Sequence, residues 1–388
     1  MEMIPSSLYE NLINDDCVIF AGAGISTEGG VYSKPSFYEI IKAKCDYPNN
    51  KKAPSFPDLM QYYCDKIDGG QRNRLTKEII SRIEIFNYPG EINRETTHFH
   101  DLLAQIPYFK RVVTTNWDTF FENRLNVLVP MVEDRDIPFW DDKKRQILKI
   151  HGCVTRPYTL VATKDDYEAC IHRNSLIFNK LRDLMASKTF IFIGYSMSDS
   201  DFQIILDEII KSLGKLRKLA YIYDPRATVE KIAFWRSKGF CVIKSYGIAF
   251  LREIREKLQK DGYMPSEEYI SFLSNEHDRI IDIHINLNQG ESEGAIASAM
   301  YQDGLIHALS TVLSGVALGS SREDFEKDVS EAEDTLKKYS KTGNFVEMAY
   351  WGGRFEIIKR FCNRAKTKIP AYFHPNKLIP THKYIKGR

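Results

Sequence analysis

The sequence predicts an α/β fold: a Rossmann-like parallel sheet with a helical insertion, followed by a smaller C-terminal helical domain. Over the first two thirds of the chain, short apolar runs alternate with longer segments of helical periodicity, which is typical of a parallel sheet covered by helices. After about residue 266 the strand pattern fades while helical periodicity continues. We therefore expect one domain over residues 1–265 and a second over 266–388.

Six apolar segments are predicted to form the sheet. They are CVIFAG (17–22), KRVVTTN (110–116), QILKIHG (146–152), TFIFIGYS (189–196), KLAYIYD (218–224) and CVIKS (241–245). Several are apolar on both faces, as strands covered by helices on both sides must be. Polar or glycine residues follow most of these runs, so candidate ligand-binding groups are expected at the carboxyl ends of the strands.

The first two predicted strands are separated by residues 31–95, which is too long for an ordinary loop. Helical patterns around SFYEIIKAKC and RLTKEIISRIEIF indicate a helical lid or subdomain there. In the C-terminal part, an apolar stripe at helical spacing ends near Gly343 and comprises Phe325, Val329, Ala332, Leu336 and Tyr339. Such a stripe must be covered, either in an assembly or partner-docking domain or as a helical cap on the chain's own α/β domain, and periodicity alone does not say which.

Composition excludes several classes of function. The 388 residues carry a formal charge of +2, so direct binding to nucleic acid or to a membrane is not expected. Seven scattered cysteines without a Cys-x-x-Cys pair favour reduced thiols in the cytoplasm over a zinc ribbon or disulfide framework. No apolar run approaches the roughly 20 residues of a spanning helix, and the histidines in HFH and DIHIN lack further ligands, so no metal is expected.

The first motif is the strand-to-helix turn Gly22-Ala23-Gly24, with Ser26 where a helix could begin. Glycines let a backbone approach a pyrophosphate, and helix-terminal N–H groups with a serine hydroxyl can bind the anion. The usual dinucleotide fingerprint has a third glycine where Thr27 stands. A plain turn without a ligand therefore remains open for this stretch alone.

Three more polar segments follow predicted strands. Asn116 and Asp118 follow the second strand and could bind a sugar, a water or a carboxamide, or could only cap the next helix. His151 follows the third strand and is a candidate proton acceptor, although a single histidine there can also be structural. Gly194 and Ser196 end the fourth strand and could contact a phosphate or ribose, or simply begin a helix.

Taken together in this order, these motifs resemble the sirtuin family, and within it a branch associated with bacterial defence. Sirtuins hold NAD and cleave its nicotinamide bond with a Gly-Ala-Gly-x-Ser loop, a Thr-x-Asn-x-Asp segment, a His-Gly pair and a late glycine–serine strand end. The matching elements are Gly22 to Ser26, Thr114 to Asp118, His151-Gly152 and Gly194 to Ser196. The resemblance covers about 250 residues and leaves the C-terminal third unexplained.

Two departures separate the chain from protein-deacylating sirtuins. Where those enzymes continue the glycine loop with Pro-Asp-Phe-Arg, this chain reads TEGGVYSKPSF, and their paired Cys-x-x-Cys zinc module is missing. The resemblance therefore implies an NAD hydrolase that releases nicotinamide and ADP-ribose, without a groove for acyl-lysine peptides. An NAD-dependent protein deacylase and a non-catalytic nucleotide sensor remain the alternatives.

The resemblance also implies a role for each site residue. Gly22, Ala23, Gly24 and Ser26 would hold the phosphates of NAD. Asn116 would position the attacking water or ribose, Asp118 would position the carboxamide, and His151 would act as general base. Ser196 and Asp224, which lies in the YDP turn, would contact the adenosine side, and Thr115 and Gly194 would also contact NAD.

Partners are implied by the same resemblance. A constitutive NAD hydrolase would kill its host, so the chain is expected to be held weakly active until phage infection is sensed. The sequence has no Gly-x-x-x-x-Gly-Lys-Ser/Thr loop for ATP. Defence proteins of this kind resemble those encoded beside a HerA-type ring ATPase, so a homo-oligomer that pairs with such an ATPase is expected.

Overall fold

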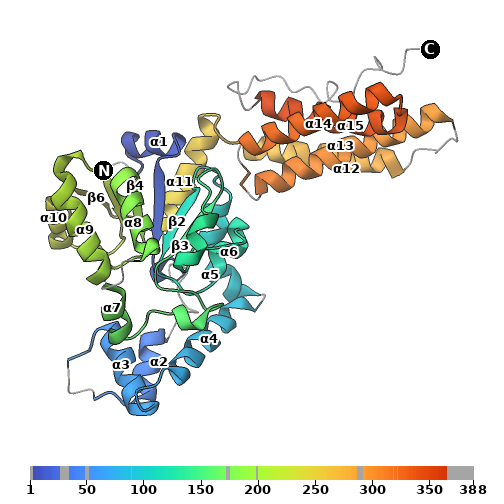
Figure 1. The fold of residues 1–388 in the computed structure, drawn as a ribbon. Coiled ribbons are helices and arrows are strands. Elements are labelled where there is room, and N and C mark those ends of the chain that lie inside the picture. The colour runs from blue at the N-terminus through green and yellow to red at the C-terminus, as the bar shows by residue number, and fades with distance from the viewer. Residues whose placement is uncertain are drawn as a thin grey trace. The chain divides into compact units, whose positions relative to one another are not determined.

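A computed structural model describes residues 3–26, 35–48, 52–88, 90–171, 175–197, 200–285, 292–317, 319–320 and 322–364. The chain divides into two compact units, Met1–Glu253 and Ile254–Arg388, and each is described by itself. The first holds the sheet and the second is helical (Figure 1).

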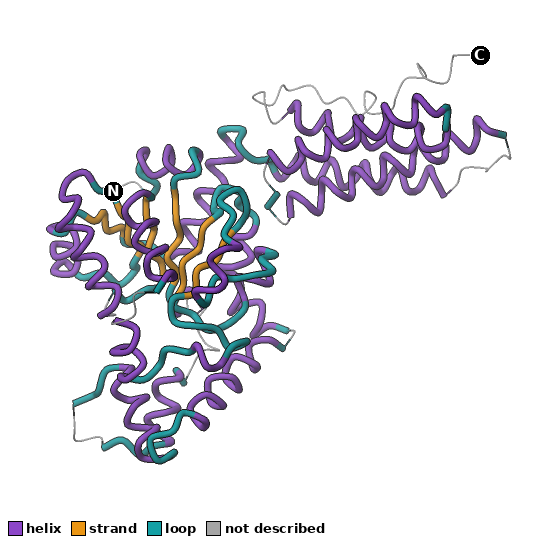
Figure 2. Tube along the Cα trace, in the orientation of Figure 1, coloured by secondary structure: helices purple, strands orange, loops and turns teal. Residues whose placement is uncertain are grey.

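The sheet of the first unit has six parallel strands. In sequence order they are β1 (Cys17–Ala21), β2 (Arg111–Thr114), β3 (Gln146–Lys149), β4 (Thr189–Ile193), β5 (Ala220–Tyr223) and β6 (Phe240–Ile243). Their spatial order is β3-β2-β1-β4-β5-β6, the order of a Rossmann fold, and Figure 2 shows them in orange. The predicted α/β class is confirmed, and the ligand crevice of such a sheet lies where the order reverses, beside β1 and β4.

Helices cover both faces of this sheet, which explains why its strands are apolar throughout. Outside the insertion, the helices up to residue 260 are α1 (Ser6–Ile13), α6 (Phe120–Leu125), α7 (Lys164–Ile171), α8 (Leu176–Ser187), α9 (Ser200–Leu213), α10 (Val229–Ser237) and α11 (Gly247–Lys260). One core joins the strands to α8, α9 and α10 around Phe192. On α11, Phe250 packs against Phe109 and Tyr223, with ring centroids 6.2 and 4.2 Å away.

The predicted helical insertion is present between β1 and β2. It contains α2 (Phe37–Lys44), α3 (Phe56–Ile67), α4 (Asn73–Asn87) and the start of α5 (Glu91–Ala104), drawn in shades of blue in Figure 1. Residues 31–34, 49–51 and 89 of the predicted insertion lie outside the described residues. Its small core includes Met60 and Ile79 and also Leu160 and Ala162, from the segment after β3. The insertion therefore packs on a loop that leaves the carboxyl end of the sheet.

The second unit contains four helices after α11. They are α12 (Glu267–Ile285), α13 (Glu293–Ala317), α14 (Arg322–Thr342) and α15 (Phe345–Arg364), and residues 365–388 lie outside the described part. The predicted stripe lies on α14, where Phe325 and Ala332 are buried. Gly343, with a φ of +68°, follows the last residue of that helix as predicted.

Glycines bring α13 and α15 into close contact. A Cβ on Gly304 would lie 2.0 Å from the carbonyl oxygen of Tyr350, and one on Gly353 would lie 2.3 Å from that of Tyr301. A side chain at either glycine would therefore force the two helices apart.

No helix in the described part of the chain combines the length and apolarity needed to cross a membrane. All seven cysteines fall within it and form no disulfide.

Candidate active site

The four motif segments emerge side by side from the carboxyl edge of the sheet. In the strand register, Ala21 pairs with Thr114 on one side and with Ile193 on the other, and Thr114 pairs with Lys149. Because the strands are parallel and end in register, the segments that follow these four residues all leave the sheet at the same edge. The sheet therefore brings together the Gly22, Asn116, His151 and Gly194 segments, whereas Asp224 follows β5, one strand further out.

The glycines of the first and fourth motifs pack directly on each other. The Gly22 N–H donates to the Ile193 carbonyl over 3.0 Å, and the Gly24 N–H donates to the Gly194 carbonyl over 2.8 Å. A Cβ on Gly24 would lie 2.7 Å from the Gly194 Cα, so this close approach requires glycine. Both N–H groups are thus used within the protein, and a role of these two glycines in holding phosphates stays a prediction.

Asn116 occupies a rigid turn at the end of β2. The Thr114 hydroxyl donates to the Ala21 carbonyl over 2.9 Å and accepts the Asn116 N–H over 3.0 Å, and the Thr115 N–H donates to the Ala21 carbonyl over 3.4 Å. The Asn116 side chain is buried, yet neither its oxygen nor its nitrogen bonds to any residue that the structure describes. Since an unsatisfied buried amide costs about 1–3 kcal/mol, this side chain is available to a ligand.

Asp118 has a structural contact of its own. Its Oδ1 accepts the N–H of Phe120 over 3.0 Å and so caps α6, which is the helix-capping alternative raised by the sequence. Burial raises the pKa of the Asp118 carboxyl, and the Lys149 ammonium opposes that rise. A contact between Asp118 and the carboxamide of NAD stays a prediction.

His151 is buried in the turn after β3. Its ring packs edge-on against Tyr167, with centroids 5.1 Å apart, and its carbonyl accepts the Val161 N–H over 3.0 Å. Gly152 has a φ of +84°, and a Cβ there would lie 2.2 Å from the Thr159 carbonyl oxygen. The His-Gly pair is therefore fixed by the loop that folds back over it.

The remaining predicted contacts have mixed surroundings. The buried hydroxyl of Ser26 bonds to none of the described residues, whereas Ala23 and Ser196 are exposed.

Asp224 accepts the Arg226 N–H over 2.9 Å and pairs with the Lys231 ammonium over 2.6 Å. Burial raises the pKa of the Asp224 carboxyl, but Lys231 and the Arg226 N–H outweigh it and the pKa is lowered. Both Asp224 oxygens are thus used, one within its own turn and one by Lys231 on α10.

Sequence reasoning missed a buried ion pair beneath the motifs. The Lys149 ammonium, only 1% exposed, lies 3.0 Å from Glu122 Oε1 and also donates to the carbonyl of Asp118. Burial alone would lower the pKa of Lys149, but Glu122, Cys153 and Asp118 together raise it. A lysine in a strand covered by helices on both sides, as in QILK, was a signal for a buried ammonium, but it does not reveal which residue pairs with it.

Sequence reasoning also missed the role of Trp117, which stands between Asn116 and Asp118. Its ring lies 6.4 Å from that of Phe37 and 6.0 Å from that of Phe56, centroid to centroid, and both rings come from the insertion. The Trp117 carbonyl accepts the Val154 N–H over 2.9 Å. The insertion is therefore joined directly to the Asn116 and His151 segments.

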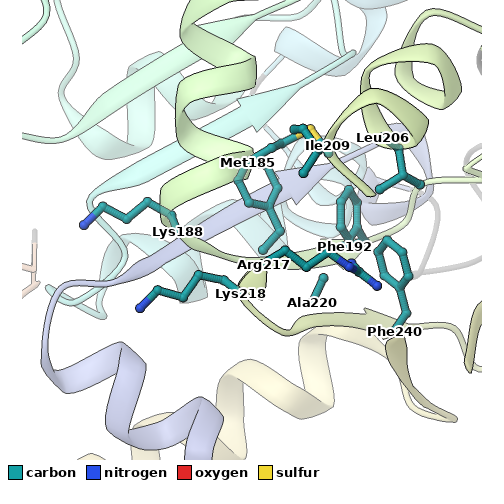
Figure 3. Close-up of a pocket in the computed structure, with 10 residues that line it drawn as sticks. Met185, Lys188, Phe192, Leu206, Ile209, Arg217, Lys218, Ala220 and Phe240 are labelled. Atoms are coloured by element: carbon teal, nitrogen blue, oxygen red, sulfur yellow. The ribbon is translucent and has the colours of Figure 1, made fainter. Parts of the chain in front are cut away.

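The pocket in Figure 3 lies elsewhere on the sheet. Lys188 and Lys218 line it just before β4 and β5 begin, together with Phe190, Phe240 and other apolar residues. Its cavity volume of about 20 Å³ has room for a water. This pocket is at the amino ends of the strands and is too small for a nucleotide. No group of three or more metal-ligating side chains occurs among the described residues.

Comparison with known proteins supports the resemblance seen in the motifs. Residues 110–243 match the SIR2-like domain family. The chain is similar to the NAD(+) hydrolase ThsA of Cytobacillus dafuensis, with 29% identity over 55% of this chain and 42% of that protein. The NAD(+) hydrolase ThsA of Bacillus cereus is 28% identical over 54% of this chain and 43% of that protein. The defense-associated sirtuin 2 of Bacillus subtilis is 24% identical over 61% of this chain and 24% of that protein.

The SIR2-like match covers three of the four motif segments and leaves out Gly22 to Ser26. The chain spans less than half the length of each of these relatives. The SIR2-like region begins at Lys110, just before β2, and ends at Ile243 with β6, so it includes Asn116, His151 and Gly194. Residues 110–243 thus match the SIR2-like domain family, which supports the resemblance to sirtuins over that part of the chain.

Proposed function

We propose that this chain hydrolyses NAD, cleaving the bond between nicotinamide and ribose to give nicotinamide and ADP-ribose. The observation that carries the proposal is the buried Asn116 amide, which no described residue satisfies, at the crevice beside β1. The segments that carry Ser26 and His151 begin at the same edge of the sheet, after the neighbouring strands β1 and β3. Relatives named NAD(+) hydrolase carry the matching region, which supports the same reaction here.

The chemistry that these groups would provide follows from the bond that breaks. Cleavage leaves positive charge on the ribose, an oxocarbenium-like state, and a water must then add to the sugar carbon. Asn116 would orient that water or the ribose, and His151 would take a proton as general base. Ser26 and the backbone near it would hold the phosphates, and Asp118 the carboxamide.

The biological role is proposed from the relatives and the fold together. A relative is named a defense-associated sirtuin, so we propose that the chain depletes cytoplasmic NAD as an antiphage-defence effector. The insertion packs on the Asn116 and His151 segments through Trp117 and Leu160, which supports its limiting access to NAD. A homo-oligomer built through the C-terminal helices, pairing with a HerA-type ATPase, would supply the trigger.

Nicotinamide release separates this proposal from a deacylase and a sensor. Purified chain is incubated with NAD, with and without an acetyl-lysine peptide, and products are followed by chromatography. We expect nicotinamide and ADP-ribose in equal amounts without the peptide. Release that requires the peptide would indicate a deacylase, and binding of NAD without release would indicate a sensor.

A further inference from the structure

A charged pair lies in the interior directly under the motif loops. Lys149 is the last residue of β3, and its ammonium contacts Glu122 in the first turn of α6 and the carbonyl of Asp118 in the loop between. Lys149 and Glu122 are 1% and 9% exposed along their side chains. One side chain therefore ties the strand that leads to His151 to the loop that carries Asn116.

Stability alone is a weak reason for this pair to exist. Taking two charges out of water costs several kcal/mol per ion, and apolar residues of similar size often replace such pairs without loss. The second Glu122 oxygen is buried and bonds to no described residue, so the pair is not even fully satisfied. The Lys149 ammonium instead fixes the position of the loop, because it holds the carbonyl of Asp118, two residues from Asn116.

Other contacts also hold this loop. The Thr114 hydroxyl donates to the Ala21 carbonyl, the Trp117 carbonyl accepts the Val154 N–H, and Asp118 Oδ1 caps α6. The Lys149 ammonium adds a contact from β3 to these. On the His151 side, Lys149 stands two residues earlier and Cys153 two residues later, and the Cys153 thiol lies 4.0 Å from Glu122 Oε1. Both site segments thus converge on the same carboxylate and ammonium.

From this geometry we infer that Lys149 is a positioning residue, which together with Glu122 holds the Asn116 loop in register with His151. The inference rests on the proposed NAD hydrolysis for its kinetic consequence. Because the Lys149 side chain is 1% exposed beneath the loop, it would not reach NAD, and its loss should impair the chemical step while NAD still binds.

Two variants test the inference. Lys149→Met keeps the length of the side chain and removes its charge, and Lys149→Met/Glu122→Leu removes both charges so that the interior stays neutral. Lys188→Met is the matched control, because Lys188 pairs with Asp16 at the opposite ends of the strands. The full chain is used throughout, with kcat and KM for NAD, Tm, and hydrogen exchange of the peptide 114–122 as readouts.

We expect the double variant to recover the Tm lost by Lys149→Met, yet to keep kcat about 10²-fold below the parent chain with KM little changed. Hydrogen exchange over 114–122 should be faster in both variants and unchanged in the control. A double variant with parental Tm, kcat and exchange would overturn the inference, as would failure of both variants to fold, which would make the pair a stability element. If the parent chain releases no nicotinamide, the proposed function fails, and the exchange measurement still decides whether Lys149 orders the loop.

Discussion

Gly24 and Gly194 meet backbone to backbone at the carboxyl ends of β1 and β4. The Gly24 N–H donates to the Gly194 carbonyl over 2.8 Å, and a Cβ on Gly194 would lie 2.4 Å from the Ile25 nitrogen. Two motifs that are 170 residues apart in sequence, 24 to 194, are thus one structural unit. Glycine is needed at both positions because a side chain at either one would clash with the backbone of the other segment.

Gly194→Ala should disrupt this contact and with it the site. Gly194 has a φ of +63°, which costs an alanine about 1–2 kcal/mol, and the new methyl would also clash with Ile25. Gly214→Ala is the matched control, since Gly214 has a φ of +53° and open space around its Cα. We expect a clearly larger fall in Tm for Gly194→Ala than for Gly214→Ala, measured by thermal unfolding. Equal falls would show that the close packing contributes nothing.

His100 should make the fold sensitive to acid. It is fully buried against the rings of Phe120 and Phe121, and burial lowers its pKa to about 3. In the unfolded chain the His100 imidazole binds a proton near pH 6.5. In the folded chain it stays neutral until about pH 3. The free energy of unfolding therefore falls as the pH falls from about 6.5 toward 3. Between about pH 7 and about pH 5, His100 lowers the free energy of unfolding by about 2 kcal/mol.

Chemical unfolding at the two pH values measures this contribution. His100→Leu should lose less stability between the two pH values than the parent chain does. The same acid sensitivity in His100→Leu would exclude His100 as its source.

The insertion should limit turnover through its link to the loop after His151. Arg72, at the start of α4, pairs with Asp166 over 2.7 Å and donates to the Leu160 carbonyl over 2.7 Å. Arg72→Gln should loosen this link and raise NAD turnover severalfold, while Arg74→Gln, at an exposed arginine paired only with Asp68 over 3.5 Å among the described residues, should not. Unchanged or lower turnover in Arg72→Gln at parental Tm would argue against a restraining insertion.

Assembly should depend on the C-terminal helices. Phe345, at the start of α15, is 68% exposed, and Ile285, at the end of α12, is 72% exposed, so apolar surface remains although the helices share a core. We expect a defined oligomer for the full chain and a monomer for a chain ending at Tyr263, by size-exclusion chromatography with light scattering. A monomeric full chain, or an oligomer of equal order after truncation, would refute this role.

The fold class and the edge of the sheet that carries the site could be predicted because strand periodicity and strand-end residues are local signals. Predicted strands ran too far at their carboxyl ends, since QILKIHG continues past Lys149 into a turn whose residues are still buried. The helix α3 was missed, because nothing in its sequence was singled out. Contacts such as Lys149 with Glu122 and Trp117 with Phe56 join residues 27 and 61 positions apart, 149 − 122 and 117 − 56, and no local pattern predicts such pairs.

Turnover of NAD by variants of Asn116 and His151 tests the central claim most directly. The parent chain, Asn116→Ala and His151→Ala are compared with two controls, Asn123→Ala on α6 and His98→Ala on α5, whose side chains bond to Thr119 and Arg252. Nicotinamide release is measured with NAD in excess, and folding is verified by Tm. We predict a fall of about 10²-fold or more in kcat for Asn116→Ala and for His151→Ala, with controls at the parental rate. Parental rates in both site variants would contradict the account.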